Sequence, residues 1–409
     1  MDASRYAPGS TVHAYNPFDT FHLGKVLLRP SVTVGYTYES NLLADPTANY
    51  ADHSIGVGPA IEAFIPVGVN GIRMDYSVNW RDYRHYDLRH AVDQTFNADS
   101  QYDFSPILNL ALRDHFAMNS LDSREYLPGR EVVFSDSGFR RNEVEGQLNW
   151  TPTETDMVAL RAGYNRVTFD QPANPGDLPF YDYSECRYSA IYKRSVTQLT
   201  SLFFDGSYRN VPTGDPRGIA SSHGYETVAG VESMITPLLS GQFSIGIRSD
   251  HYTGAGIENS NALVYRGSIM KEITETNRVT FSLSHGTGMS YFQQNAYFAT
   301  QGYGITYGHE IGRSLSLSVS PTYLRNGYPL PIEAGPGIPG SAVGEKRVDG
   351  MVEINLNALY WFKDWLAAEV WFDYLRRRST LPDYSFTDYR FGVDVIVGSR
   401  STAVGRSPY

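Results

Sequence analysis

Polar and apolar residues alternate along much of this chain. Residues 71–83, GIRMDYSVNWRDY, carry an apolar side chain at every second position, with Arg, Asp, Ser and Asn between them. A period of two is that of a β-strand with one apolar and one polar face. In a soluble protein the apolar face would pack on a core. In a membrane barrel it would contact lipid, and the charged residues would face inward.

The same alternation recurs from about residue 27 to the end, and no segment keeps a helical period. VALRAGYN, FSIGIRSD, VEINLNALYWF and FGVDVIV are further examples. We predict about 18 strands of roughly ten residues or more. Their expected spans are 27–40, 54–66, 71–83, 91–104, 106–118, 139–151, 155–168, 182–194, 197–210, 223–236, 240–253, 261–273, 277–290, 295–308, 312–325, 347–361, 364–377 and 384–398.

The connections between these spans alternate in length. Short turns such as VGVNG, TPTET and KRSV are followed in turn by long segments such as LDSREYLPGREVVFSDSGF and RNGYPLPIEAGPGIPGSAVGEK. Outer-membrane barrels have short periplasmic turns and long extracellular loops, whereas a soluble sandwich has no reason to sort its loops in this way. We therefore predict an all-β, transmembrane, antiparallel up-and-down barrel over residues 25–398. Residues 1–24 are expected to form a periplasmic tail or partial plug, and 399–409 a C-terminal tail.

The aromatic content is typical of a protein with one surface that faces water and one that faces lipid. Hydrophobic residues make up 41% and the mean hydropathy is −0.34, yet aromatic residues reach 13%. Several lie near predicted strand ends, which fits two girdles at the membrane interfaces, although aromatic residues are also common in strands generally. They are Trp150, Tyr252, Tyr291, Phe292, Tyr323, Tyr360, Phe362, Trp365 and Tyr374.

Charge and cysteine content exclude other classes. A formal net charge of −10 leaves no basic surface for nucleic acid. The single cysteine, Cys186, cannot form an internal disulfide. No apolar run is long enough for a transmembrane helix, and no signal peptide is apparent, so we expect one to have been removed before this sequence begins.

Catalytic motifs are missing from the sequence. Ser284 and His285, like Asp250 and His251, are adjacent, so each pair should point to opposite faces of a strand. We find no GxSxG turn, no HExxH and no paired Cys/His ligands. We therefore predict no enzyme, no metal and no cofactor, and keep an outer-membrane hydrolase as a third alternative.

The first expected strand reads SVTVGYTYESNLL. Its end resembles the opening of the β-barrel porins associated with bacterial exopolysaccharide loci. The matching positions are Gly35, Tyr36, Tyr38, Glu39, Ser40 and Asn41. The resemblance implies a large outer-membrane barrel beside a polysaccharide export machine, with periplasmic export proteins as partners.

A barrel of this size encloses a lumen wide enough for water and solutes. We predict an exopolysaccharide channel with no chemical step; the alternative is a general or small-solute porin. Inward charges should contact the solute or brace the wall through ion pairs. The candidates are Arg73, Asp75, Arg81, Arg113, Arg161, Arg248, Asp250, Glu353, Glu369, Asp373, Arg390 and Asp394. Trp361 and Trp371 share their register and are candidate sugar platforms.

Two features at the expected extracellular end remain open. Arg376, Arg377 and Arg378 could bind phosphates of outer-leaflet lipid or lipopolysaccharide, or form an ordinary solvated strand end. The Pro- and Gly-rich segment within 326–346 could fold inward as a gate or remain an extracellular loop.

Overall fold

The computed structural model describes residues 21–47, 50–67, 70–86, 92–119, 131, 138–170, 181–254, 257–292, 295–334 and 342–398. In these ranges nearly all regular structure is β-strand, with one short 3-10 helix, η5 (Pro382–Tyr384). The strands are β1 (Phe21–Leu23), β2 (Val26–Glu39), β3 (Asp52–Val67), β4 (Asn70–Tyr83), β5 (Val92–Ser105), β6 (Leu108–Asn119), β7 (Phe139–Trp150), β8 (Asp156–Phe169), β9 (Tyr183–Ser195), β10 (Thr200–Val211), β11 (Ser222–Thr236), β12 (Leu239–Tyr252), β13 (Ser260–Thr274), β14 (Asn277–Met289), β15 (Tyr297–Ile311), β16 (Leu315–Pro331), β17 (Lys346–Lys363), β18 (Leu366–Ser379) and β19 (Phe386–Gly398).

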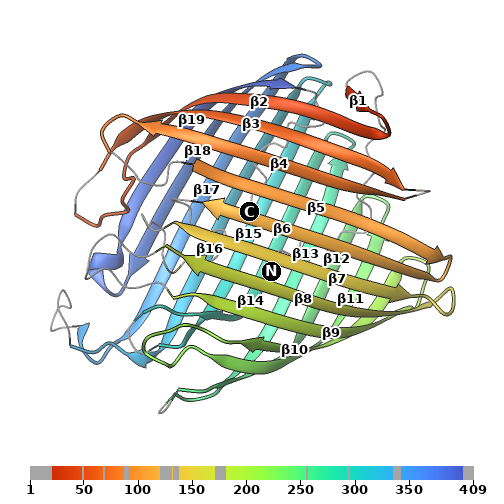
Figure 1. Cartoon of the computed structure of the whole chain (residues 1–409). Coiled ribbons are helices and arrows are strands. Elements are labelled where there is room, and N and C mark those ends of the chain that lie inside the picture. Colours follow the sequence, from red (N-terminus) through yellow and green to blue (C-terminus); the bar gives the residue numbers. More distant parts are fainter. Residues whose placement is uncertain are drawn as a thin grey trace.

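Strands β2 to β19 form a closed antiparallel barrel of 18 strands. Each pairs with its neighbour in the chain, and β19 returns to pair with β2, where Asp394 lies opposite Gly35. Figure 1 shows the strands as one tilted sheet curved round on itself. The predicted fold is therefore confirmed, and each expected strand is present with ends that shift by a few residues.

Strand β1 was not predicted. It lies within the segment expected to be a tail and pairs with Val26–Leu28 of β2, whereas β19 covers β2 from Ser31 onward. The short strand thus continues the edge that the last strand leaves uncovered. The remainder of the predicted tails, 1–20 and 399–409, lies outside the described residues.

The two ends of the barrel differ in their connections. Short turns follow the odd-numbered strands from β3 to β17, and the longer connections follow the even-numbered ones. We call the end with the longer connections the outer rim and the other end the inner rim; in outer-membrane barrels they are extracellular and periplasmic, respectively. No helix within the described ranges is long and apolar enough to cross a membrane.

The barrel is apolar outside and polar inside. On β4, Tyr76 and Trp80 point outward with 38% and 48% of their surface exposed, whereas Arg73 and Asp75 line a cavity on the inner side. The other strands follow the same alternation, with outward Val, Leu, Ile and Tyr side chains. This arrangement suits a lipid environment and answers the question raised by the alternating pattern.

The aromatic girdles are present in part. Trp150, Tyr360 and Trp365 are exposed on the outer surface toward the inner rim, and Tyr323 is exposed nearer the outer rim. Tyr291 and Phe292 were assigned wrongly. They belong to the β14–β15 connection, and their exposures of only 5% and 2% show that they pack inside the outer rim.

Candidate functional site

The lumen wall is lined by ion pairs. All six arginines predicted to face inward do so, and each lies near an inward acid. The pairs are Arg73–Glu62 (3.1 Å), Arg81–Asp93 (2.9 Å), Arg113–Asp99 (3.5 Å), Arg161–Glu145 (3.7 Å), Arg248–Asp250 (3.0 Å) and Arg390–Asp373 (3.5 Å). Five of the six join neighbouring strands, so they brace the barrel and leave little unbalanced charge on this wall. Contact of these residues with a solute stays a prediction.

The predicted acids are also held by the wall. On β17–β19, Asn355 donates hydrogen bonds to Asp373 at 2.8 Å and to Glu353 at 3.4 Å, and Asn357 donates to Glu369. On the far side, Asn97 donates to Asp75 at 2.6 Å. These side chains are fixed in position by neighbours rather than extended into the lumen.

Trp361 and Trp371 lie on the inward face but are packed. Their exposures are 6% and 4%, respectively. The indole of Trp371 lies over Gly392, whose missing side chain leaves the space, and its N–H donates to Asp394 at 2.9 Å. Trp361 packs in a small cluster with Leu359, Ala367 and Ile396. Neither ring offers an open face on which a sugar could stack, which counts against the predicted platforms.

One sector of the wall is neutral and lined by small residues. Phe298, Leu324 and Asn326 are larger inward side chains near the outer rim. The other inward positions along β14–β16, between these residues and the Arg278 and Glu310 positions near the inner rim, carry hydroxyls or no side chain at all. They are Thr280, Ser282, Ser284, Gly286, Gly288, Thr300, Gly302, Gly304, Thr306, Gly308, Ser316, Ser318, Ser320 and Thr322. Because these side chains are short, the lumen extends close to the backbone here.

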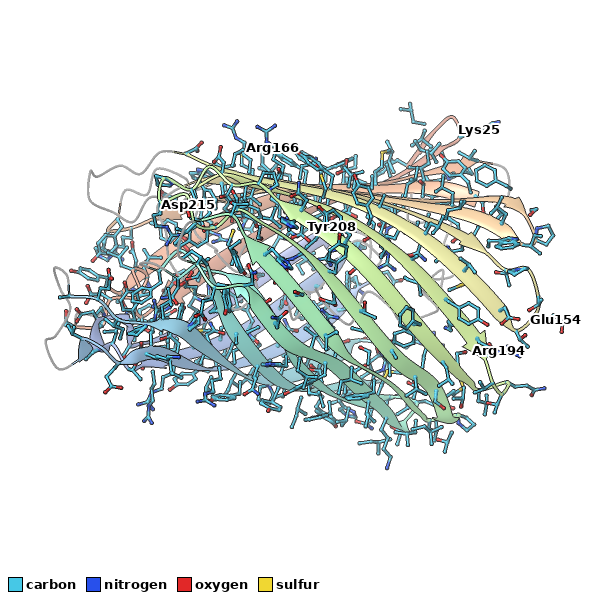
Figure 2. All side chains as sticks on the ribbon, turned by 90° about the horizontal axis from the view of Figure 1, so that it is seen from below. Lys25, Glu154, Arg166, Arg194, Tyr208 and Asp215 are labelled. Atoms are coloured by element: carbon cyan, nitrogen blue, oxygen red, sulfur yellow. The ribbon has the colours of Figure 1, made fainter. Side chains whose placement is uncertain are left out.

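Several connections of the outer rim meet at Ser290. Its carbonyl oxygen accepts hydrogen bonds from the Tyr181 hydroxyl (2.9 Å) and from Arg217 (3.1 Å), and its hydroxyl donates to Glu131 (2.7 Å). These partners come from the β8–β9, β10–β11 and β6–β7 connections. Asp215, which holds Arg217 at 2.9 Å, lies at this rim in Figure 2, opposite Glu154 and Arg194 at the inner rim. We call this group the rim bridge.

Glu131 is the most deeply buried acid of the rim bridge. It is 3% exposed, and its carboxylate also accepts the Tyr291 N–H at 2.6 Å. Burial raises the pKa of Glu131 above its ordinary value, although Arg347 and these donors act in the opposite direction. Its backbone carbonyl accepts a 2.7 Å hydrogen bond from Arg377, which ties the bridge to β18.

Arg347 anchors the other side of the bridge. It is 1% exposed and pairs with Asp349 at 2.7 Å. Its guanidinium lies 4.5, 4.6 and 3.9 Å from the ring centres of Phe292, Tyr328 and Tyr384, respectively. Cation–π contact and ion pairing together offset the cost of burying the charge. The alternation of polar and apolar residues did not predict these contacts of Arg347, because the residues involved come from four separate segments.

The three consecutive arginines of β18 are divided between the two faces. Arg376 and Arg378 are exposed on the outer surface, as a lipid-headgroup site requires. Arg377 was assigned wrongly: it points inward, is 7% exposed and donates to Glu131 and Tyr384. The period of two already implies that the middle residue of such a triplet faces the opposite way.

The motif that suggested a family closes the barrel seam. Asn41 donates its backbone N–H to Asp388 at 2.9 Å and its side-chain amide to Asp45 and Thr387. Ser40 also donates to Asp388, at 2.9 Å. Tyr38 packs against Tyr389 and Phe391 on the outer surface, and Tyr36 contacts His53. The motif thus joins the end of β2 to β19.

The residue pairs considered for hydrolysis lie on opposite faces. Ser284 faces the lumen, whereas His285 stacks on Tyr265 outside. Asp250 is held inside by Arg209 and Arg248, whereas His251 stacks on His223. Among the described residues, no group of three His, Cys, Asp or Glu is placed to hold a metal ion.

Comparison with known families adds to this picture. The family model described as "Putative beta-barrel porin 2" matches residues 208–398, which run from β10 to the end of β19. This match is consistent with the resemblance seen in the first strand, although that motif lies outside the matched range. The match covers somewhat less than half of the chain, and over these residues the protein is similar to this family.

Solved structures are similar to this chain at low sequence identity. The siderophore receptor PirA from Pseudomonas aeruginosa is 11% identical, with a TM-score of 0.47, and the match covers 90% of this chain and 80% of that one. Pseudomonas aeruginosa OpdK, solved with vanillate, is also 11% identical, with a TM-score of 0.48 and coverage of 91% and 98%. No curated protein sequence matches this barrel.

Proposed function

We propose that this barrel conducts exopolysaccharide across the outer membrane through a polar lumen, without a chemical step. The observation that supports this most directly is the neutral wall of β14–β16, where hydroxyls and glycines run along the lumen. Periplasmic export proteins would deliver the polymer to the inner rim.

A neutral hydroxyl wall suits a sliding glycan. Each exchange of a water contact for a Ser or Thr contact changes the free energy by only about 1 kcal/mol, so a long polymer can move without being held at one place. The facing walls carry charge, but the arginines there are paired with acids. The lumen therefore offers many weak hydrogen-bonding positions and few isolated charges.

The alternative is a small-solute porin, and the rim bridge favours it. The contact between Glu131 and Ser290 crosses the outer mouth and would narrow the passage, which would sieve solutes by size. For polymer export the bridge must open, whereas for a small-solute porin it can stay in place.

Deletion of the gene in the native bacterium separates the two functions. Export predicts that polysaccharide accumulates in the periplasm while uptake of small antibiotics is unchanged. A porin predicts normal polymer secretion with slower antibiotic uptake. Re-expression of the wild-type chain should restore whichever process was lost.

Purified protein in liposomes tests the lumen wall directly. Liposomes loaded with fluorescent neutral oligosaccharides should release them, and Ser282→Asp with Ser318→Asp should slow this release several-fold. Ser105→Asp with Thr197→Asp, at the inner-rim turns, adds the same charge outside the neutral wall and serves as the matched control. Equal rates for the two double variants would count against conduction along β14–β16.

A further inference from the structure

The outer surface of β16–β18 changes from apolar to cationic near the outer rim. On β18 the outward residues are Ala368, Val370, Phe372 and Tyr374, followed by Arg376 and Arg378. On β16 the outward series reaches Tyr323 and then Arg325. The change occurs at matching register, because Arg325, Gly350 and Arg378 lie in one row across β16, β17 and β18.

Gly350 opens a groove between the two outer arginines of that row. The strands that carry Arg325 and Arg378 are about 10 Å apart, and glycine leaves the strand between them without a side chain.

The groove has a volume of about 590 Å³ and opens on the outer surface. Its lining is Tyr323, Val348, Gly350, Val352, Arg376, Arg378, Ser379 and Thr380. A side-chain carbon placed on Gly350 would lie 3.3 Å from the Tyr323 hydroxyl, so this hydroxyl borders the groove floor.

The arginines around the groove are available to a ligand. Within the described ranges, the side chains of Arg325, Arg376 and Arg378 make no ion pair or hydrogen bond, whereas the neighbouring Arg377 is fully engaged inside the rim. Three cations close together on one surface repel one another, and an anion between them would relieve that repulsion. Guanidinium groups match phosphate geometry in particular, because they donate two parallel hydrogen bonds.

The groove lies at the level of the outer-leaflet headgroups. From Leu366 to Arg376, a strand tilted by about 45° rises roughly 24 Å, close to the apolar band of about 25 Å in outer-membrane barrels. Trp365 marks the opposite interface with 58% of its surface exposed. A molecule in the groove would therefore place its acyl chains along Tyr374 and Val352 and its headgroup against the arginines.

We propose that this groove binds the phosphorylated glucosamine headgroup of lipid A, the membrane anchor of lipopolysaccharide. The position favours a lipid over free phosphate, because the cationic groove continues directly into the lipid-facing surface. The site is independent of the proposed transport function: it lies on the outer surface, and its failure would leave the lumen unaffected.

Native mass spectrometry of the full chain in detergent tests the site. The wild-type protein should retain one molecule of bisphosphorylated lipid A in preference to phosphatidylglycerol. It should retain less monophosphorylated lipid A than bisphosphorylated lipid A. R376A/R378A should lower retention at least tenfold. Gly350→Leu, which fills the groove and keeps every charge, should lower it several-fold.

The matched control is R166A/R194A. It removes two outward arginines as well, one at each rim and both away from β16–β18 (Figure 2). Retention should equal that of the wild type. The proposal is overturned if R376A/R378A retains lipid A as well as the control does, or if the wild type binds phosphatidylglycerol equally well.

Discussion

The Ser290 hydroxyl donates a 2.7 Å hydrogen bond to Glu131, a residue 159 positions away in the chain. Their connections leave the barrel on nearly opposite sides: eight strands separate them in one direction and ten in the other. The contact therefore crosses the outer mouth. Opening the mouth requires this bond and its neighbours to separate.

The buried carboxylate makes the rim bridge sensitive to pH. Burial raises the pKa of Glu131, so the docked bridge binds a proton more tightly than the undocked one. The closed rim bridge is thus most stable below the ordinary glutamate pKa, and it weakens as the pH rises through the raised pKa of Glu131. We expect single-channel recordings in planar bilayers to show longer closures at pH 4.5 than at pH 7.5.

Glu131→Gln is the matching variant, because glutamine resembles the protonated acid. Its closures should be long at both pH values. Asp215 does not interfere: burial opposes its ionisation, but Arg217 and backbone N–H groups lower its pKa, so its contribution is lost only at more acidic pH. A wild-type channel with pH-independent closures would contradict the role of Glu131.

Arg347→Met should loosen the outer rim without unfolding the barrel. The variant leaves Asp349, which is fully buried, without its ion-pair partner, and breaking a buried pair costs about 3–5 kcal/mol. We expect a higher open probability in planar bilayers and faster protease cleavage at the outer rim. Arg347→Lys keeps the charge without the planar guanidinium, so its open probability and cleavage rate should lie between those of the wild type and Arg347→Met. If Arg347→Met were cleaved as slowly as the wild type, Arg347 would not hold the outer rim together.

The wall itself can be tested by paired substitutions on β19. Val393 points outward, whereas Asp394 points inward and accepts the Trp371 hydrogen bond. Val393→Arg should lower the free energy of unfolding by about 2–4 kcal/mol if it lies near the bilayer midplane. Asp394→Asn should cost much less in guanidinium titrations in lipid vesicles. Equal costs would mean that the two faces are assigned in reverse.

The seam contacts predict a stability loss from a single amide. Asn41→Ala removes the hydrogen bonds from this buried side chain to Asp45 and Thr387, so unfolding should become easier by about 1–3 kcal/mol. Asn261→Ala, at an exposed position near the same rim, is the control and should change stability by less than about 0.5 kcal/mol. Similar denaturation midpoints for both variants would show that the seam does not depend on Asn41.

The strands could be predicted because alternation is a local property. It placed Arg73 and Asp75 inside and Tyr76 outside from the sequence alone. It missed β1, because three residues are too few to show a period.

The rim bridge could not be predicted in the same way. Glu131 and Ser290 meet only through the closure of the barrel, and nothing near Arg347 in sequence indicates three rings around it. Alternation also gives the face of Trp371 but not its packing on Gly392, which depends on the neighbouring strand.

The seam has a consequence for biogenesis. Asn41 and Asp388, which bond across it, stand 347 positions apart. A nascent chain that has not yet reached β19 would expose an unpaired β2 edge, which hydrocarbon does not tolerate. Insertion into the bilayer must therefore wait for the last strand to be synthesised, and a chain truncated before residue 386 should remain with periplasmic chaperones instead of entering the membrane.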